Sequence, residues 1–207
     1  MKQKNPRTRK RLPASERKEL ILDAAMRTFV EFGYHGAIMD TIAERASVTK
    51  PILYRHFPSK LDLLLSIVDR ADKQLRNNMI DTTAKIGNLY EIIEREVKAH
   101  FDFVEKYDMG YRLIYESDLH VDKEVSERIK KTRLDIIDNV AESIRLNTNP
   151  AELSIQDAEI IGLMLVSIVE SVAMSWINTR DKPREQYERN LIKGIFRILA
   201  KLPPRRV

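Results

Sequence analysis

Cysteine is absent from the 207-residue sequence, and glycine and proline are scarce, at 6 and 8 residues. The absence of cysteine excludes a disulfide scaffold, a thiolate metal site and a cysteine nucleophile. Apolar residues reach 43% and charged residues 32%, a mixture rich in side chains that lose little freedom in a helix. The composition therefore predicts an all-α fold, with one large domain or a small domain joined to a larger one.

A long uncharged apolar run is also missing. The most apolar stretch, residues 160–177, contains Glu170 and several interleaved serines, whereas a membrane span needs about 20 largely uncharged residues. The first 19 residues carry eight Lys or Arg and no apolar core of a signal peptide. We therefore expect a cytoplasmic protein with no membrane segment, whose apolar stretch is a buried helix.

Acidic charge is scarce at one end of the chain. Residues 1–60 hold 13 Lys and Arg against 6 Asp and Glu, whereas residues 61–207 hold 23 against 25. A basic front on a nearly neutral body indicates a polyanionic partner. The alternative is a basic N-terminus that is merely solvated.

Apolar residues recur at three- and four-residue steps, which predicts about nine helices and no strand. We expect Gly33 to end the first helix, Thr49 to cap the third with Pro51 in its first turn, and Ser59 to form a capping box with Asp62. The expected helices are residues 15–33, 38–46, 49–57, a long one from 59 through 75, 89–106, 110–118, 121–146, 154–179 and 184–202.

A short turn, residues 46–49, joins the second and third helices, as in a helix-turn-helix. Leu53 and Phe57 face the core, so the rest of the third helix presents donors and positive charge suited to a major groove. Lys60 adds a cation for another phosphate. In the basic arm, Arg9 and Arg11 are expected in a minor groove or along phosphates, unless the arm is only a solubilising tail. The expected DNA-binding residues are Arg9, Arg11, Thr49, Lys50, Pro51, Ile52, Tyr54, Arg55, His56 and Lys60.

Several residues fall at set spacings over about 50 positions: Phe29, Gly33-Tyr34, Ile42-Ala43, Ala46-x-Val48-x-Lys50 and Leu53-Tyr54-x-x-Phe57-x-x-Lys60-x-x-Leu63. This pattern closely resembles the TetR family of bacterial transcriptional regulators. The resemblance implies a homodimer that binds a palindromic operator with its N-terminal domains, while its C-terminal helices bind a small ligand and dimerise. Ser47 stands where the family often has glycine, and a serine in that left-handed turn costs about 1 kcal/mol.

With that resemblance, the chain divides into a flexible basic arm (1–14), a helix-turn-helix DNA-binding domain (15–58) and a ligand-binding and dimerisation domain (59–207). Residues 101–105 and 110–116 resemble the actinobacterial fatty-acid-synthesis regulators of the FasR group. This resemblance implies a long-chain acyl-CoA effector held in a tunnel, and control of lipid or fatty-acid biosynthesis genes. From the apolar faces of four helices we choose the residues that would hold the acyl tail: Phe101, Leu113, Ile137, Leu165 and Val169.

Two further expectations concern the body. Glu170 lies among apolar residues, where an unpaired charge is costly. One interpretation is that it pairs with an arginine or faces the rim, and the other is that it is a switchable carboxylate in a pocket. The helix that begins at Ser59 is the expected lever, because it starts at the DNA and ends in the body.

Other functions are disfavoured by the residues. The four histidines are scattered, and no metal-binding helix pattern, phosphate loop or nucleophile elbow is present. We therefore expect no enzyme, no catalytic residue, no metal and no cofactor beyond a small-molecule effector. A non-specific nucleic-acid protein would not need so large an apolar body. Within the regulators, the alternative is a repressor that senses a drug-like or other hydrophobic compound and controls an efflux or catabolic gene.

Overall fold

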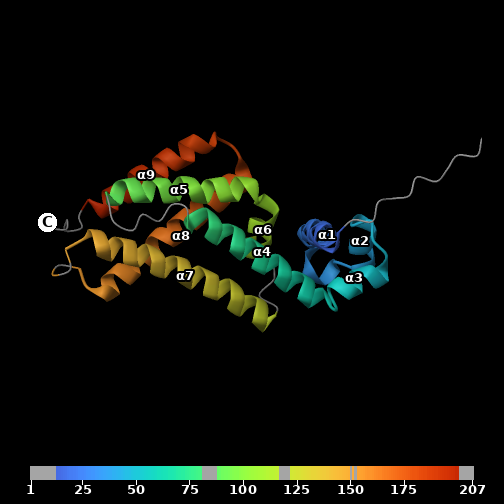
Figure 1. Ribbon diagram of the computed structural model, residues 1–207. Coiled ribbons are helices and arrows are strands. Elements are labelled where there is room, and N and C mark those ends of the chain that lie inside the picture. The colour runs from blue at the N-terminus through green and yellow to red at the C-terminus, as the bar shows by residue number, and fades with distance from the viewer. Residues whose placement is uncertain (1–12, 81–87, 117–121, 150, 152, 201–207) are drawn as a thin grey trace, which may run out of the picture. The chain divides into compact units, whose positions relative to one another are not determined.

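The computed structural model describes residues 13–80, 88–116, 122–149, 151 and 153–200. In these ranges the chain forms nine α-helices and no strand (Figure 1), which confirms the all-α prediction. The predicted basic arm, with Arg9 and Arg11, lies outside the described residues. The helices are α1 (Ala14–Gly36), α2 (Met39–Arg45), α3 (Lys50–His56), α4 (Lys60–Ile80), α5 (Leu89–Lys106), α6 (Asp108–Glu116), α7 (Lys123–Asn147), α8 (Ile155–Thr179) and α9 (Arg184–Leu199).

The chain divides into two compact units, and the division falls between Ser66 and Ile67, inside α4. The domain boundary predicted between residues 58 and 59 coincides with the start of α4, whereas the first unit extends to Ser66. The first turns of α4 belong with α1–α3 because Leu63 and Leu64 are buried and the Lys60 ammonium donates to backbone carbonyl oxygens that follow the kink in α1. As a result α4 is one continuous helix that contributes to both units.

The first unit is built around α1, whose buried face carries the apolar residues that the periodicity predicts. Gly33 has a positive φ of 69° and interrupts the helix, and a last turn continues to Gly36. Only glycine takes this conformation without strain. The prediction that Gly33 ends the regular helix is therefore confirmed. The largest core residues of this unit are Ile21, Phe29, Ile42, Leu53, Phe57, Leu63 and Leu64.

Helix caps follow the sequence with one exception. At the start of α4, the backbone N–H of Asp62 donates to Ser59 Oγ at 3.0 Å, and the Ser59 hydroxyl donates to the Asp62 carboxylate at 2.7 Å. Ser59 therefore caps α4 as expected, and the Asp62 carboxylate accepts from the Ser59 hydroxyl where a capping box would use the Ser59 backbone N–H. Thr49 stands at the N-cap position of α3, but its side chain makes no capping hydrogen bond. The predicted position is thus confirmed, whereas a side-chain cap is not formed there.

In the second unit, α8 packs along α7 and also contacts α5 and α9. Gly162 permits a close approach of α8 to α7, because a Cβ at this position would lie only 3.0 Å from the carbonyl oxygen of Ile137 and 3.1 Å from the backbone nitrogen of Ala141. Toward the C-terminal end of α8, Trp176 packs against Phe101 of α5, with ring centroids 5.6 Å apart. The core of this unit is therefore centred on α8.

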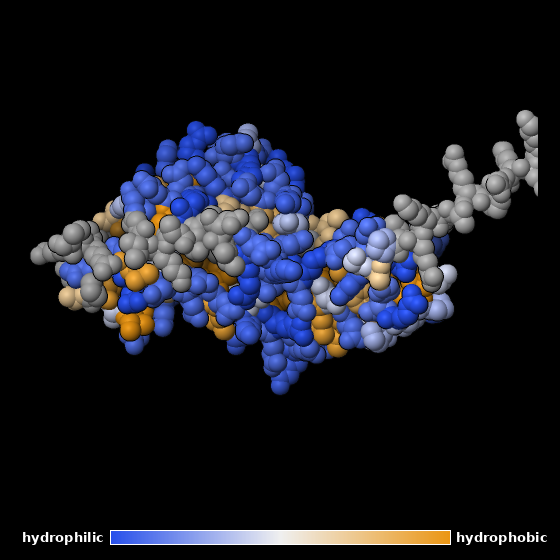
Figure 2. Space-filling model, in the orientation of Figure 1, coloured by the Kyte–Doolittle hydropathy of each residue, from blue (hydrophilic) through white to orange (hydrophobic). Residues whose placement is uncertain are grey.

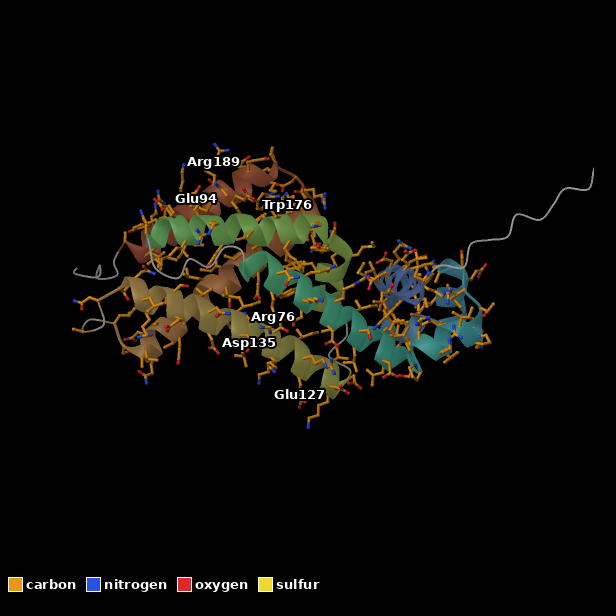
Figure 3. All side chains as sticks on the ribbon, viewed as in Figure 1. Arg76, Glu94, Glu127, Asp135, Trp176 and Arg189 are labelled. Atoms are coloured by element: carbon orange, nitrogen blue, oxygen red, sulfur yellow. The ribbon has the colours of Figure 1, made fainter. Side chains whose placement is uncertain are left out.

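Two ion pairs join α4 to α7. Arg76 on α4 donates to Asp135 on α7 at 2.6 Å, and the two side chains meet between these helices in Figure 3. Arg128 on α7 contacts Asp69, about two turns nearer the start of α4. All four side chains are more than a third exposed. The second half of α4 is thus held to the body partly by exposed charges.

In the described ranges, one helix, α8, is long and apolar enough to cross a membrane by length and composition alone. In its most apolar 18 residues, 39% are buried inside this chain. The core helix of a soluble protein has the same properties. Leu165, Val166 and Ala173 are buried, and Glu170 is buried in an ion pair. Near the start of α8, hydrophobic atoms reach the surface (Figure 2), where Ile160 and Met164 are about half exposed.

Candidate functional site

The first candidate site is the turn between α2 and α3. Ser47 has a φ of 54°, the left-handed conformation for which the family often uses glycine. The Ser47 and Val48 N–H groups donate to the carbonyl oxygens of Glu44 and Ala43, which closes the turn. Ala46 is buried where the two helices meet. The predicted helix-turn-helix is therefore present.

The outward face of α3 is largely as predicted. Its first turn and two later side chains are solvent-exposed, while Ile52 is half-buried and Leu53 is fully buried. This face offers a hydroxyl, a phenol and two cations, which suit phosphate oxygens and base edges. Contact with DNA stays a prediction for these residues. The exposed positions are Thr49, Lys50, Pro51, Tyr54 and Arg55.

Lys50 has a partner that sequence reasoning missed. Its ammonium lies 2.8 Å from Asp40 Oδ1 on α2 and 3.1 Å from Oδ2. The hydrogen bond and the charge of Asp40 raise the pKa of Lys50. Asp40 thus already engages the Lys50 ammonium, and a base or phosphate that bound Lys50 would have to compete with this exposed pair.

His56 does not present its ring outward, contrary to the prediction. The ring is half-buried, and Nε2 is buried without a hydrogen-bond partner in the described part of the chain. Burial, followed by the nearby charges of Arg55, Arg17 and Lys18, lowers the pKa of His56. His56 is therefore a neutral packing residue beside Phe57, because the short helix turns this position toward the core.

Lys60 also departs from its predicted role. Its ammonium donates to three carbonyl oxygens, those of Tyr34 at 2.7 Å, Ala37 at 3.0 Å and His35 at 3.3 Å. It also lies 4.6 Å from the centroid of the Tyr34 ring. An ammonium has three donors, and all three are used here. Lys60 thus ties the start of α4 to the end of α1, and its contact with a DNA phosphate stays a prediction.

The second candidate site is a cavity of about 50 Å³ inside the C-terminal unit. Leu165 and Val169 line it, as chosen from the sequence, but Phe101 and Ile137 do not. Phe101 packs on Trp176, and Ile137 lies in the contact between α7 and α8. The side chain of Leu113 lies outside the described part of the structure. Helices α5 to α9 all contribute to the lining: Ile93, Glu96, Val97, His100, Tyr115, Ile136, Val140, Leu165, Val166, Val169, Glu170 and Ile195.

Polar residues in this cavity were missed, because the choice of ligand residues was restricted to apolar ones. Glu96 and His100 lie one turn apart on α5. Each is three residues from Ile93 or Val97, so the sequence spacing already placed them on the same helix face as these apolar residues. Burial raises the pKa of Glu96 to about 7 and lowers that of His100 to about 4. His100 Nε2 lies 3.3 Å from the Tyr111 hydroxyl. His100 is therefore a neutral, hydrogen-bonded core residue.

Glu170 is paired, as one of the two sequence interpretations proposed. Arg133 Nε donates to Glu170 Oε2 at 2.9 Å, and the Tyr115 hydroxyl donates to Oε1 at 3.0 Å. Arg133 also donates to Ser167 Oγ at 2.8 Å. Burial and the charge of Glu170 raise the pKa of Tyr115, so its hydroxyl stays a donor. This network satisfies a carboxylate that would otherwise be buried alone.

The cavity is small beside typical ligand sites, which measure about 300–1,000 Å³. A volume of about 50 Å³ holds only a few waters. A long acyl chain therefore has to displace side chains in order to enter. No group of three or more His, Asp or Glu with metal-binding geometry occurs among residues 13–80, 88–116, 122–149 and 153–200.

A groove of about 470 Å³ runs between α8 and α9 on the outside of the same unit. Ile168 and Val172 line one side, and Tyr187 and Ile198 line the other. Gly194 lies in this groove, and a Cβ on it would have nothing within 4 Å. The groove is therefore open and mostly apolar, with Lys182, Gln186 and Asn190 also in its lining, and no contact inside the chain requires glycine at position 194.

Comparison with known proteins agrees with this architecture. The family model "Bacterial regulatory proteins, tetR family" matches residues 21–67, and "Tetracyclin repressor-like, C-terminal domain" matches residues 89–198. A curated relative, the HTH-type transcriptional activator FasR of Mycolicibacterium smegmatis, is 36% identical over 84% of this chain and 77% of its own length.

Two solved structures share the fold. A TetR-like transcriptional regulator from Rhodococcus sp. RHA1 superposes with a TM-score of 0.78 at 24% identity, over 92% of this chain and 100% of that one. AibR, solved in complex with isovaleryl coenzyme A and operator DNA, superposes with a TM-score of 0.70 at 20% identity, over 91% of this chain and 99% of its own.

Proposed function

Since this chain belongs to the TetR family of bacterial regulatory proteins and is therefore a DNA-binding transcriptional regulator, we propose that it binds a palindromic operator as a homodimer and responds to a long-chain acyl-CoA. It works in the cytoplasm and controls genes of lipid or fatty-acid biosynthesis. The observation that supports an apolar effector is the mostly apolar cavity that α5 to α9 line.

The acyl-CoA assignment rests on three supports. Each buried methylene of an acyl chain gains about 0.8 kcal/mol, and the cavity walls are mainly Ile, Leu and Val. The relative with 36% identity is FasR, in agreement with the resemblance to fatty-acid-synthesis regulators. The structural neighbour AibR was solved with an acyl-CoA and its operator.

Homodimerisation is proposed through the groove between α8 and α9. Its apolar lining and the open space over Gly194 fit a second copy of the same two helices, which would form a four-helix interface. Two-fold symmetry then sets the two α3 helices on successive major grooves, with half-sites about 34–36 Å apart.

The effector acts by differential binding. A ligand shifts an equilibrium only when it binds two states unequally, so the acyl chain favours one arrangement of the two DNA-binding units. Helix α4 is the proposed connection, because it is continuous from Lys60 to Ile80. Repression and activation both fit this scheme, and the sign follows from whether the ligand raises or lowers operator affinity.

The test is a gel-shift titration of the full-length protein on its operator with palmitoyl-CoA, and in parallel with palmitate and coenzyme A. We expect palmitoyl-CoA to change operator affinity by about tenfold, and Val169→Trp to abolish the response while leaving affinity without ligand intact. Ile160→Trp, on the exposed side of α8, is the control and keeps the response. Unchanged affinity with palmitoyl-CoA rejects the acyl-CoA function.

A second candidate effector is a cationic, drug-like compound. Glu96 gives the cavity a carboxyl group. Besides burial, only the charge of its chain neighbour Arg95 affects the pKa of this group. A cation bound there would stabilise the ionised carboxylate. If a hydrophobic cation shifts operator affinity in the same titration, and Glu96→Gln removes that effect, this alternative replaces the acyl-CoA.

A further inference from the structure

A second small cavity lies next to the first. It measures about 20 Å³, and apolar residues of α4 form one of its walls: Val68, Ala71 and Leu75. Phe103 of α5 and Ile129 of α7 face them, and Tyr115 of α6 completes the lining. Tyr115 also lines the first cavity. At this side chain, therefore, the two cavities share a wall.

The same wall contains a buried ion pair. Glu170 lines the first cavity, Arg133 lines the second, and the two are joined at 2.9 Å. Tyr115 donates to the other oxygen of Glu170 at 3.0 Å. The wall is thus one layer of three side chains, held by hydrogen bonds to a single carboxylate.

From this arrangement we propose that Tyr115, Arg133 and Glu170 form a gate that sets the chain length to which the protein responds. The inference rests on the proposed acyl-CoA function and adds to it a specificity-determining element. A short acyl chain ends in the first cavity and leaves the gate closed. A long chain passes the gate and enters the second cavity, where it displaces side chains as it does in the first.

The closed state is favoured without ligand because opening separates Glu170 from its partners. The Glu170 side chain is only 10% exposed, so an unpaired carboxylate there would lose most of its hydration. The Arg133 side chain is 37% exposed, which lets it swing toward water and keep its charge solvated. The apolar surface that a long chain buries in the second cavity offsets the cost of opening.

The gate also explains which ligands transmit a signal. Only a chain that passes it contacts Val68, Ala71 and Leu75, and these residues lie on α4. Helix α4 continues back to Lys60, which is tied to the end of α1. A chain confined to the first cavity touches α5 to α9 and leaves α4 unaltered. Short chains therefore bind without regulating.

The test measures the Kd of octanoyl-CoA and palmitoyl-CoA by isothermal titration with the full-length protein. Ala71→Leu fills the second cavity, and we expect it to raise the Kd of palmitoyl-CoA about tenfold while that of octanoyl-CoA changes less than about twofold. Val97→Phe is the matched control in the first cavity, and it weakens both ligands. Tyr115→Phe removes one gate hydrogen bond without changing the ring, and it lowers the Kd of palmitoyl-CoA alone.

Each outcome decides between the two proposals. If Ala71→Leu weakens both ligands equally, or neither, the gate is rejected while the acyl-CoA function stands. If the wild-type protein binds no acyl-CoA of either length, the proposed function fails and the gate fails with it. Should Ala71→Leu melt at a much lower temperature than wild type, Tyr115→Phe carries the test, and equal effects on both ligands overturn the gate.

Discussion

Two titratable residues in the first cavity oppose each other in their effect on stability. In the folded chain Glu96 has its pKa raised from 4.5 to about 7, so it keeps a proton that the unfolded chain releases as the pH rises through that window. The free energy of unfolding therefore falls between about pH 4.5 and 7 on account of Glu96. His100, with its pKa lowered from 6.5 to about 4, is neutral where the unfolded chain takes up a proton. The free energy of unfolding therefore decreases on account of His100 as the pH falls from 6.5 toward 4.

These signs predict how the two variants differ from wild type. Glu96→Gln should be more stable than wild type above pH 7, by about 2 kcal/mol for a half-buried group, with the difference shrinking toward pH 4.5. His100→Gln should remove the loss on the acid side, so its difference from wild type changes mainly between pH 6.5 and 4. Urea unfolding across this pH range measures both. Curves that run parallel to wild type would show that neither group titrates as the structure indicates.

Substitutions of Lys50 and Tyr54 should affect DNA binding in different ways. Lys50→Ala should change which operator base is preferred, if the ammonium leaves Asp40 for a guanine edge, with a cost of about 1–3 kcal/mol at that base. Tyr54→Phe should weaken binding to all operator variants alike, because an exposed phenol on α3 is suited to a phosphate. Competition gel shifts over a set of single-base operator variants distinguish them. A uniform loss for Lys50→Ala would assign it to the backbone.

Residue type and spacing predict which residues can bind, but not which ones are already engaged. Lys50, Lys60 and His56 all belong to the outward basic set by sequence. Lys50 pairs with Asp40, and Lys60 donates to three carbonyl oxygens. The His56 ring is half-buried, and its Nε2 has no hydrogen-bond partner in the described part of the chain. Each outcome depends on where the end of α1 and the start of α2 come to lie, and no periodicity within α3 contains that information.

At the scale of helices, local signals were sufficient. Glycine at a positive φ, serine caps and three- to four-residue apolar steps placed all nine described helices within a few residues of their observed ends. The cavity needs more, since five helices distant in sequence supply its walls. Apolar faces on α5 and α7 were equally plausible as core or as lining. Of the residues predicted to hold a ligand, Leu165 and Val169 line the cavity, whereas Phe101 and Ile137 do not.

The contact between α7 and α8 depends on a missing side chain. Gly162→Ala should destabilise the C-terminal unit by about 1–3 kcal/mol, although alanine favours a helix, because the new Cβ would meet backbone atoms of α7 at 3.0 and 3.1 Å. Gly36→Ala is the matched control, since the nearest atom there is the Phe32 Cβ at 3.4 Å. Thermal unfolding compares them. Equal melting temperatures would mean that the two helices separate without cost.

For the whole molecule, the central prediction is the dimer. Gly194→Glu places a charged side chain in the open groove between α8 and α9, where the single chain has room for it. The variant should fold but sediment as a monomer at micromolar concentration, and operator affinity should fall because a palindrome needs both units. Arg189→Ala alters the net charge equally at an exposed position that does not line the groove (Figure 3), and it should remain dimeric. A dimeric Gly194→Glu variant would place the interface elsewhere.

The exposed ion pairs between α4 and α7, Arg76 with Asp135 and Arg128 with Asp69, connect the regulator to its ionic surroundings. Added salt screens such pairs, with a Debye length of about 10 Å at 0.1 M, and it also weakens every contact to DNA phosphates. Ionic strength therefore acts on this protein twice, once on operator affinity and once on how firmly α4 is held to the body. The strength of an effector response and the strength of operator binding should consequently change with salt along different curves, because the response also depends on how firmly α4 is held to the body.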